Sequence, residues 1–176
     1  MARFSSELIQ AIREQYTLPW RGTHGVTHWA RVREAGLCLA ARTGANPVVV
    51  ELFAVLHDAR RRNEGVDPGH GGRGADFAAT LRGTLIHLPD AEFALLHTAC
   101  ADHTRGLLEA DITIQTCWDA DRLDLGRVGT TPGPARLCTA AARDADMIRW
   151  AERCSGGGDV PPVVDQDWDA GRRTRR

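Results

Sequence analysis

The chain has 176 residues, a formal net charge of −1 at pH 7 and 43% hydrophobic residues, which fits one globular domain. Balanced charge provides no overall attraction to nucleic acid or to an anionic membrane surface, so we expect neither as a partner. Every basic residue other than histidine is arginine, which excludes catalysis through a lysine Schiff base.

Helical periodicity runs through almost the whole chain, and we expect an all-α fold. In the second predicted helix, Val32, Ala35, Cys38 and Leu39 recur at the helical spacing. Asn46 is the predicted cap of the third helix. The predicted helices, seven in all, span about 5–16, 25–42, 47–58, 74–82, 89–103, 113–125 and 135–153.

Two segments have the composition of loops. The stretch 63–74 is rich in Gly, Asp and Pro, and its length favours a functional loop over a simple connection. Residues 155–176 combine glycines and prolines with Asp-rich and Arg-rich stretches. We therefore predict a single helical domain over 1–154 and a flexible C-terminal tail over 155–176.

The five cysteines contain no C-x-x-C pair and are odd in number, so we expect buried free thiols in a reducing compartment. The N-terminal residues contain acids and no long apolar core, unlike a secretory signal. The longest apolar run, 48–56, is too short to cross a bilayer. These features predict a cytoplasmic protein with no membrane partner.

Metal-ligand residue types occur at the ends of three predicted helices. His57 and Asp58 follow the apolar run, His24 and His28 share a helix face, and Asp121 lies far along the chain. Two imidazoles and two carboxylates, from His28, His57, Asp58 and Asp121, suit an octahedral centre with open water positions. This donor set suits such an open centre with Mn, Fe, Co, Ni or Mg better than it suits a closed zinc site.

The order and spacing of these motifs resemble the HD-domain superfamily of metal-dependent phosphohydrolases. The first His lies in an H-x-x-R-V motif (28–32), the pair is the H-D dipeptide, and the last Asp lies in A-D-R-L-D (120–124). The resemblance covers about 24–125. It implies an all-α bundle of six to seven helices with the metal site between helix ends, and a first metal held by His28, His57, Asp58 and Asp121.

Two further motifs resemble the two-metal version of the family pattern. His70 begins an H-x-x-x-G-A segment, and His103 lies in a segment similar to I-x-x-H-S, although Ala99 replaces the isoleucine. By resemblance to the two-metal branches these histidines would hold a second metal and Asp58 would bridge the two, and the sequence leaves open whether the centre holds one metal or two. The sequence leaves the metal open among Mn, Fe, Co, Ni, Mg and Zn.

The resemblance implies hydrolysis of a phosphate ester of a small molecule, with a nucleotide as the first class to test, by water that the metal activates. Asp58 and Glu64 are the predicted catalytic residues, with Glu64 as a proton shuttle. We expect at least one of the run Arg60, Arg61 and Arg62 to bind phosphate. His24 is a further predicted substrate contact.

Several alternatives stay open. The same ligand set suits a di-iron oxygenase, and the fold also occurs as a binding or regulatory module without catalysis. Homo-oligomers are compatible with the sequence. We expect Asp124 to pair with Arg122 or Arg127, and Asp119 to be a surface or supporting acid rather than a ligand.

Overall fold

The computed structural model describes residues 4–169, and within them the all-α prediction is confirmed. No β-strand is present in this part of the chain, only one isolated bridge between Arg82 and Ile86. Three short elements complete the described chain: η1 (Asp124–Val128) follows α6, η2 (Pro134–Arg136) precedes α7, and η3 (Val164–Trp168) lies near its C-terminal end. The α-helices are α1 (Ser6–Gln15), α2 (Val26–Thr43), α3 (Pro47–Leu56), α4 (His70–Leu81), α5 (Asp90–Asp102), α6 (Ile112–Leu123), α7 (Ala140–Arg143) and α8 (Ala145–Gly156).

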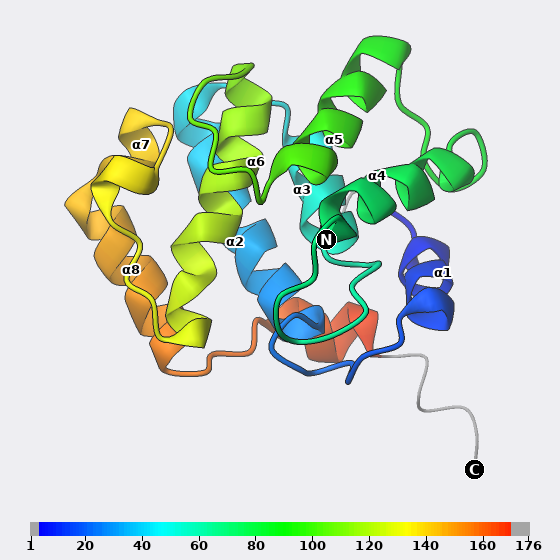
Figure 1. Cartoon of the computed structure of the whole chain (residues 1–176), viewed down its shortest axis with the longest axis horizontal. Helices are drawn as coiled ribbons and strands as arrows, with labels where there is room; N and C mark the ends of the chain where they lie inside the picture. Colours follow the sequence, from blue (N-terminus) through cyan, green and yellow to red (C-terminus); the bar gives the residue numbers. More distant parts are fainter. Residues whose placement is uncertain (1–3, 170–176) are drawn as a thin grey trace.

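Helix α3 is the centre of the core. All residues from 49 to 56 are buried, as expected for a helix that is apolar on every side. Its start is fixed as predicted, because the Asn46 side chain accepts hydrogen bonds from the backbone N–H groups of Val48 and Val49. Helices α2, α5 and α6 pack around it, α4 lies on α5, and α7 and α8 lie on the far side of α2 and α6 (Figure 1).

Two helix boundaries differ from the prediction. Helix α4 begins at His70, not near residue 74, so the preceding loop ends at Gly69 in the left-handed conformation that glycine favours. The predicted last helix is divided at Asp144. Thr139 caps α7 and the Asp144 side chain caps α8 by accepting from Asp146 and Met147, so each piece has its own N-terminal cap.

The chain beyond residue 154 packs on the domain, which differs from the predicted tail. Helix α8 extends to Gly156, and Val164 and Trp168 are buried in the hydrophobic core. Trp20 Nε1 donates a hydrogen bond of 2.7 Å to Asp169. Two large apolar side chains therefore hold this segment against the first helices, whereas residues 170–176 of the predicted tail lie outside the described part of the chain.

The cysteines are free thiols: Cys100, Cys117 and Cys138 are buried and Cys154 is half-buried, but Cys38 is exposed, unlike the expectation from its helix. No helix within residues 4–169 combines the length and the apolar character that a membrane crossing requires.

Candidate metal centre

His57 directly follows the last residue of the central helix α3 and is fully buried. Its Nδ1 lies 3.1 Å from the carbonyl oxygens of Phe53 and of Ala54, and a carbonyl can only accept, so Nδ1 is the protonated nitrogen. Burial lowers the pKa of His57 to about 3, which keeps the ring neutral at pH 7. The Nε2 atom therefore presents a lone pair to the space beyond the helix end.

His28, on α2, presents its lone pair to the same space. Its Nδ1 donates a hydrogen bond of 2.7 Å to the Asp124 carboxylate, which leaves Nε2 unprotonated. The Nε2 atoms of His28 and His57 lie 3.1 Å apart. Two acceptors cannot hydrogen-bond to each other, so a cation between them fits this contact.

Asp121, from α6, completes this first set of donors. Its Oδ1 lies 3.4 Å from His28 Nε2 and 3.7 Å from His57 Nε2. That oxygen is buried and makes no hydrogen bond within the described residues. Burial opposes its ionisation, but the surrounding side chains, among them the charged Arg127 guanidinium 3.9 Å away, outweigh burial and hold the pKa of Asp121 well below its usual range. An ionised, buried oxygen without a donor is what a metal ligand provides.

His70 and His103 form a second pair of the same kind. The Nδ1 atoms donate to the carbonyl oxygens of Asp67 and Cys100, at 2.7 and 2.8 Å. Their Nε2 atoms lie 3.0 Å apart, again with lone pairs facing each other. His70 is the first residue of α4 and His103 follows the last residue of α5, so the packing of these two helices makes the pair.

Asp58 lies between the two pairs. Its Oδ2 is 3.7 Å from His28 Nε2 and 3.8 Å from His57 Nε2, and its Oδ1 is 3.1 Å from His70 Nε2 and 3.7 Å from His103 Nε2. Burial opposes ionisation, but neighbouring imidazoles outweigh it and hold the pKa of Asp58 well below its usual value. One oxygen of this carboxylate therefore faces each pair of imidazoles.

Asp124 supports the centre from behind, a role that the sequence did not indicate. The expected partners were Arg122 or Arg127, but the main partner is Arg31, whose Nε and Nη2 donate to the carboxylate at 2.6 and 3.0 Å. Arg127 is 3.9 Å away. Arg31 lies three residues after His28, on the same face of α2, and that spacing was the available signal.

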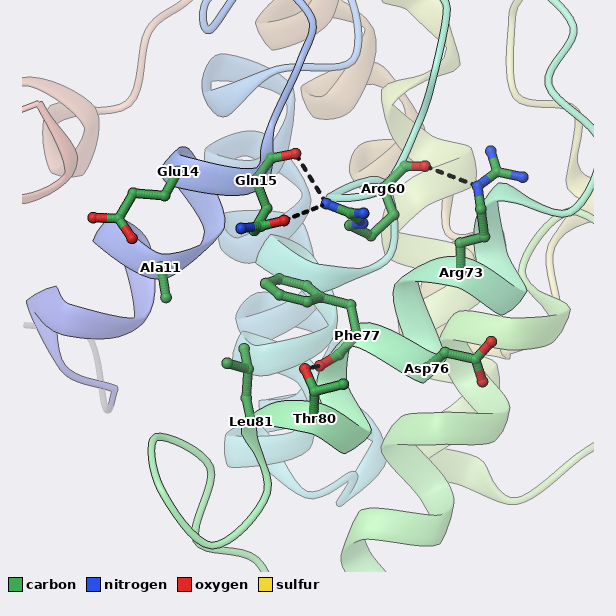
Figure 2. A pocket seen from close by; sticks show the side chains of 9 residues that line it. All are labelled: Ala11, Glu14, Gln15, Arg60, Arg73, Asp76, Phe77, Thr80 and Leu81. Carbon is green, nitrogen blue, oxygen red and sulfur yellow. Dashed lines mark hydrogen bonds between the residues drawn. The ribbon is translucent and has the colours of Figure 1, made fainter.

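Of the arginine run, only Arg61 lies at the centre. Its Nη1 is 3.1 Å from His70 Nε2 and 3.6 Å from Asp58 Oδ1. Arg60 instead donates to Gln15 and lies over the Phe77 ring, where it lines a separate groove between α1 and α4 (Figure 2). The Arg62 side chain is exposed. The successive residues point in different directions, so one of the three reaches the ligands.

The structure places His24 and Glu64 beside the centre rather than at an open surface. His24 Nδ1 lies 2.9 Å from Asp58 Oδ2, so His24 contacts a ligand instead of facing the cavity. The Glu64 carboxylate accepts from the backbone N–H of His24 at 3.2 Å and does not line the cavity on the ligands. Asp119 is also removed from the ligands, since it accepts hydrogen bonds from Cys138 and Thr139.

A cavity of about 500 Å³ opens directly onto the ligands. Its walls combine acidic and imidazole ligands with four guanidinium groups and several aliphatic side chains. The arginines from the C-terminal half were not expected there, because they lie on α6, η1 and η2, which meet only in the folded chain. The lining residues are Asp58, Arg61, His70, His103, Thr104, Gly106, Leu108, Asp121, Arg122, Leu125, Arg127, Ala135 and Arg136.

Fold and centre together define the class: an all-α HD-domain fold with two His/Asp donor groups that could hold metal, His28–His57–Asp121 and His57–Asp58–His103. The chain is similar to the crystal structure of a predicted HD superfamily hydrolase from an uncultured Thermotogales bacterium. The two share 25% sequence identity with a TM-score of 0.67, over 90% of this chain and 91% of the other. No family model and no curated protein matches the chain. The resemblance that the motifs indicated is thereby confirmed.

Proposed function

We propose that the protein is a metal-dependent phosphohydrolase that acts on a phosphate ester of a small molecule, with two divalent cations bridged by Asp58. The observation that supports it most is the position of that carboxylate, with one oxygen facing each pair of imidazole lone pairs. His28, His57 and Asp121 would hold the first cation, and His70 and His103 the second. Oxygen and imidazole donors of this kind suit Mn, Fe, Co, Ni, Mg or Zn.

Bound divalent metals would supply Lewis acidity at the phosphoryl oxygen and lower the pKa of water beside it. The residues of the chain perform the remaining tasks. Arg61, held by carbonyl oxygens of Asn63 and Gly65, places a guanidinium 3.6 Å from Asp58 Oδ1, where it can pair with a phosphate oxygen. Asp58, the predicted catalytic carboxylate, stays ionised, and His24 donates to its Oδ2 at 2.9 Å, which fixes the carboxylate between the two pairs of imidazoles.

The four arginines of the cavity favour an anionic substrate, and this supports the phosphohydrolase over the di-iron oxygenase on the same ligands. The buried, hydrogen-bonded ligands favour an active centre over a silent module, since buried charges without a role are costly. A nucleotide is the first substrate class to test. Glu64, the predicted proton shuttle, accepts from the His24 backbone N–H, which holds its carboxylate beside the centre but outside the cavity lining.

The test combines metal analysis with hydrolysis assays on the full chain. We expect up to two transition metals per chain after anaerobic purification. We also expect phosphate release from at least one nucleotide or phosphomonoester with Mn, Co, Ni or Mg. Asp58→Ala should lose the metals and the activity while keeping its helical circular dichroism. Phosphate release by metal-free Asp58→Ala would contradict the proposal, and two irons with oxygen uptake and no phosphate release would favour the oxygenase.

A further inference from the structure

Arg136 differs from the other three arginines of the cavity. Arg61 donates to the carbonyl oxygens of Asn63 and Gly65, Arg122 to those of Leu107 and Arg136, and Arg127 to those of Thr23 and Asp124. The Arg136 side chain lines the same cavity and makes no hydrogen bond or ion pair with any residue between 4 and 169. Its guanidinium donors are therefore free to bind a ligand.

The backbone that carries Arg136 is held in place by buried side chains of α6. Arg122 Nη1 donates to the Arg136 carbonyl at 2.9 Å. Three residues earlier on the helix, the Asp119 carboxylate accepts from the backbone N–H groups of Cys138 and Thr139 at 2.6 and 2.8 Å. Such bonds to charged side chains are among the stronger ones in proteins. The backbone of Arg136 is therefore held in a fixed position, although its side chain is exposed.

Arg122 also fixes the opposite wall. Its Nη2 donates to the Leu107 carbonyl at 2.7 Å, between Gly106 and Leu108, which both line the cavity. One buried guanidinium thus joins the wall formed by the α5–α6 loop to the segment that carries Arg136. The distance between these walls is set by α6, which also carries the ligand Asp121.

Charged side chains line the cavity from its buried part to its exposed part. Asp58 and Arg61 are 2% and 7% exposed, whereas Arg136 is on the surface. The other lining residues include the aliphatic Leu108, Leu125 and Ala135. A phosphate at the ligands would therefore leave the remainder of a small molecule near aliphatic side chains and near the free guanidinium. A volume of about 500 Å³ suits a compact metabolite.

We infer that the substrate carries a second anionic group, a carboxylate or a further phosphate, and that Arg136 binds it. The inference rests on the proposed function and narrows its substrate class. A guanidinium presents a planar fork of N–H donors that pairs with either group through two parallel hydrogen bonds. Arg136 is then a specificity-determining residue, and Arg122 positions it.

Matched substrates isolate the second charge. Glycerol 3-phosphate and 3-phosphoglycerate are similar in size and differ by a carboxylate; fructose 6-phosphate and fructose 1,6-bisphosphate differ by a phosphate. With Mn, the wild type should have at least a tenfold higher kcat/KM for the doubly anionic member of one pair. Arg136→Ala should reduce that ratio about tenfold, mainly through KM, and Arg136→Lys by less. Arg105→Ala, on an exposed arginine of the α5–α6 loop outside the cavity lining, should keep the wild-type ratio.

The outcomes separate the two proposals. Hydrolysis without preference in either pair would overturn the inference, and so would a preference that survives in Arg136→Ala, because the metals alone would then account for it. Absence of hydrolysis of all four esters and of nucleotides, with every metal tested, would overturn the proposed function itself. The preference should also decrease as the salt concentration rises, since the Arg136 contact is exposed to solvent.

Discussion

Asp124 accepts a hydrogen bond of 2.7 Å from Nδ1 of His28, and this contact decides which nitrogen of the imidazole is free for a metal. Arg31 holds the same carboxylate through two hydrogen bonds and donates with its third nitrogen to the Asp159 carbonyl. His28, a candidate metal ligand, is thus oriented by a carboxylate that is itself fixed. Such supporting contacts set both the tautomer and the ring position of a metal ligand.

Replacing this carboxylate should weaken metal binding without unfolding the protein. For Asp124→Asn we expect about a 10- to 100-fold weaker affinity for Mn, the usual effect of losing the partner of a ligand histidine. Isothermal titration of the metal-free protein measures the affinity, and circular dichroism monitors the fold. Asp146→Asn, on the exposed start of α8, is the matched control and should bind Mn as the wild type does. An unchanged affinity in Asp124→Asn would show that Asp124 does not orient His28.

The two adjacent glycines at the start of α4 should respond oppositely to alanine. A Cβ on Gly71 would lie 2.5 Å from the Cys100 carbonyl oxygen and 3.0 Å from His103 Nδ1, whereas a Cβ on Gly72 meets nothing within 4 Å. Gly71→Ala must push α4 away from α5 and separate His70 from His103. Gly72→Ala should instead raise stability by up to about 1 kcal/mol, because alanine is the better helix former.

Thermal unfolding and metal stoichiometry test this pair. Gly71→Ala should have a lower melting temperature and bind one metal less than the wild type, and Gly72→Ala should melt at the same or a higher temperature with unchanged metal content. If Gly71→Ala bound the full complement of metal, the close contact of α4 with α5 would not be what brings the second pair of histidines together.

The sequence predicted which helices form more accurately than where each helix begins and ends. The apolar run 48–56 with Asn46 before it was sufficient for α3, since cap and burial pattern are both local. The start of α4 was missed because glycines at 69, 71 and 72 resemble a loop locally. In the folded chain Gly69 has the positive φ that precedes the helix, and the close approach of α4 to α5 requires a glycine at position 71. Trp168 was predicted to lie in a flexible tail for a related reason. An isolated aromatic residue after a glycine-rich stretch does not show which surface it will cover.

The candidate ligands could be predicted because their residue types and order carry the chemistry, but the surroundings could not. The six predicted ligands come together in one place, because the four histidines among them lie within 3.8 Å of Asp58 and Asp121 lies 3.4 Å from one of them, His28. The supporting carboxylate Asp124 was assigned to a neighbour in sequence, whereas its partner Arg31 lies on another helix. The sequence did not indicate that Arg136 lines the cavity, because only the packing of α6 against the segment before α7 brings it there.

Acid should destabilise the metal-free protein between pH 6.5 and about 4 through His57. Burial lowers the pKa of this residue from an ordinary 6.5 to about 3 in the folded state, so the unfolded chain binds one more proton in this range. Unfolding therefore becomes easier as pH falls, by up to about 1.4 kcal/mol per pH unit for one proton. The pKa values of Asp58, Asp121 and Asp124 are all lowered from 3.8, so their contributions are lost only below this range.

His103 acts in a different range. Burial lowers its pKa, but the neighbouring Asp58 and Asp121 carboxylates outweigh burial and raise the pKa above 6.5, so its stabilising contribution is complete below 6.5 and is lost as pH rises above that value. Urea unfolding in EDTA at pH 4.5, 5.5 and 6.5 measures the His57 effect. His57→Gln should flatten the dependence by about one proton, and the control His97→Gln, on a partly exposed histidine far from the ligands, should not. Equal slopes in the two variants would contradict the assignment.

Asp119 should be a determinant of stability rather than a metal ligand. Its side chain is fully buried and accepts three hydrogen bonds, from the backbone N–H groups of Cys138 and Thr139 and from the Thr139 hydroxyl. Asp119→Ala removes all three and leaves the two buried backbone N–H groups unpaired, which should lower the free energy of unfolding by about 3 kcal/mol. Urea unfolding measures this loss, and the Mn stoichiometry of the folded protein should be unchanged. Thr139→Val, which removes only the hydroxyl contact and the α7 cap, should cost less; a larger loss in Thr139→Val than in Asp119→Ala would show that the cap, not the carboxylate, fixes the segment.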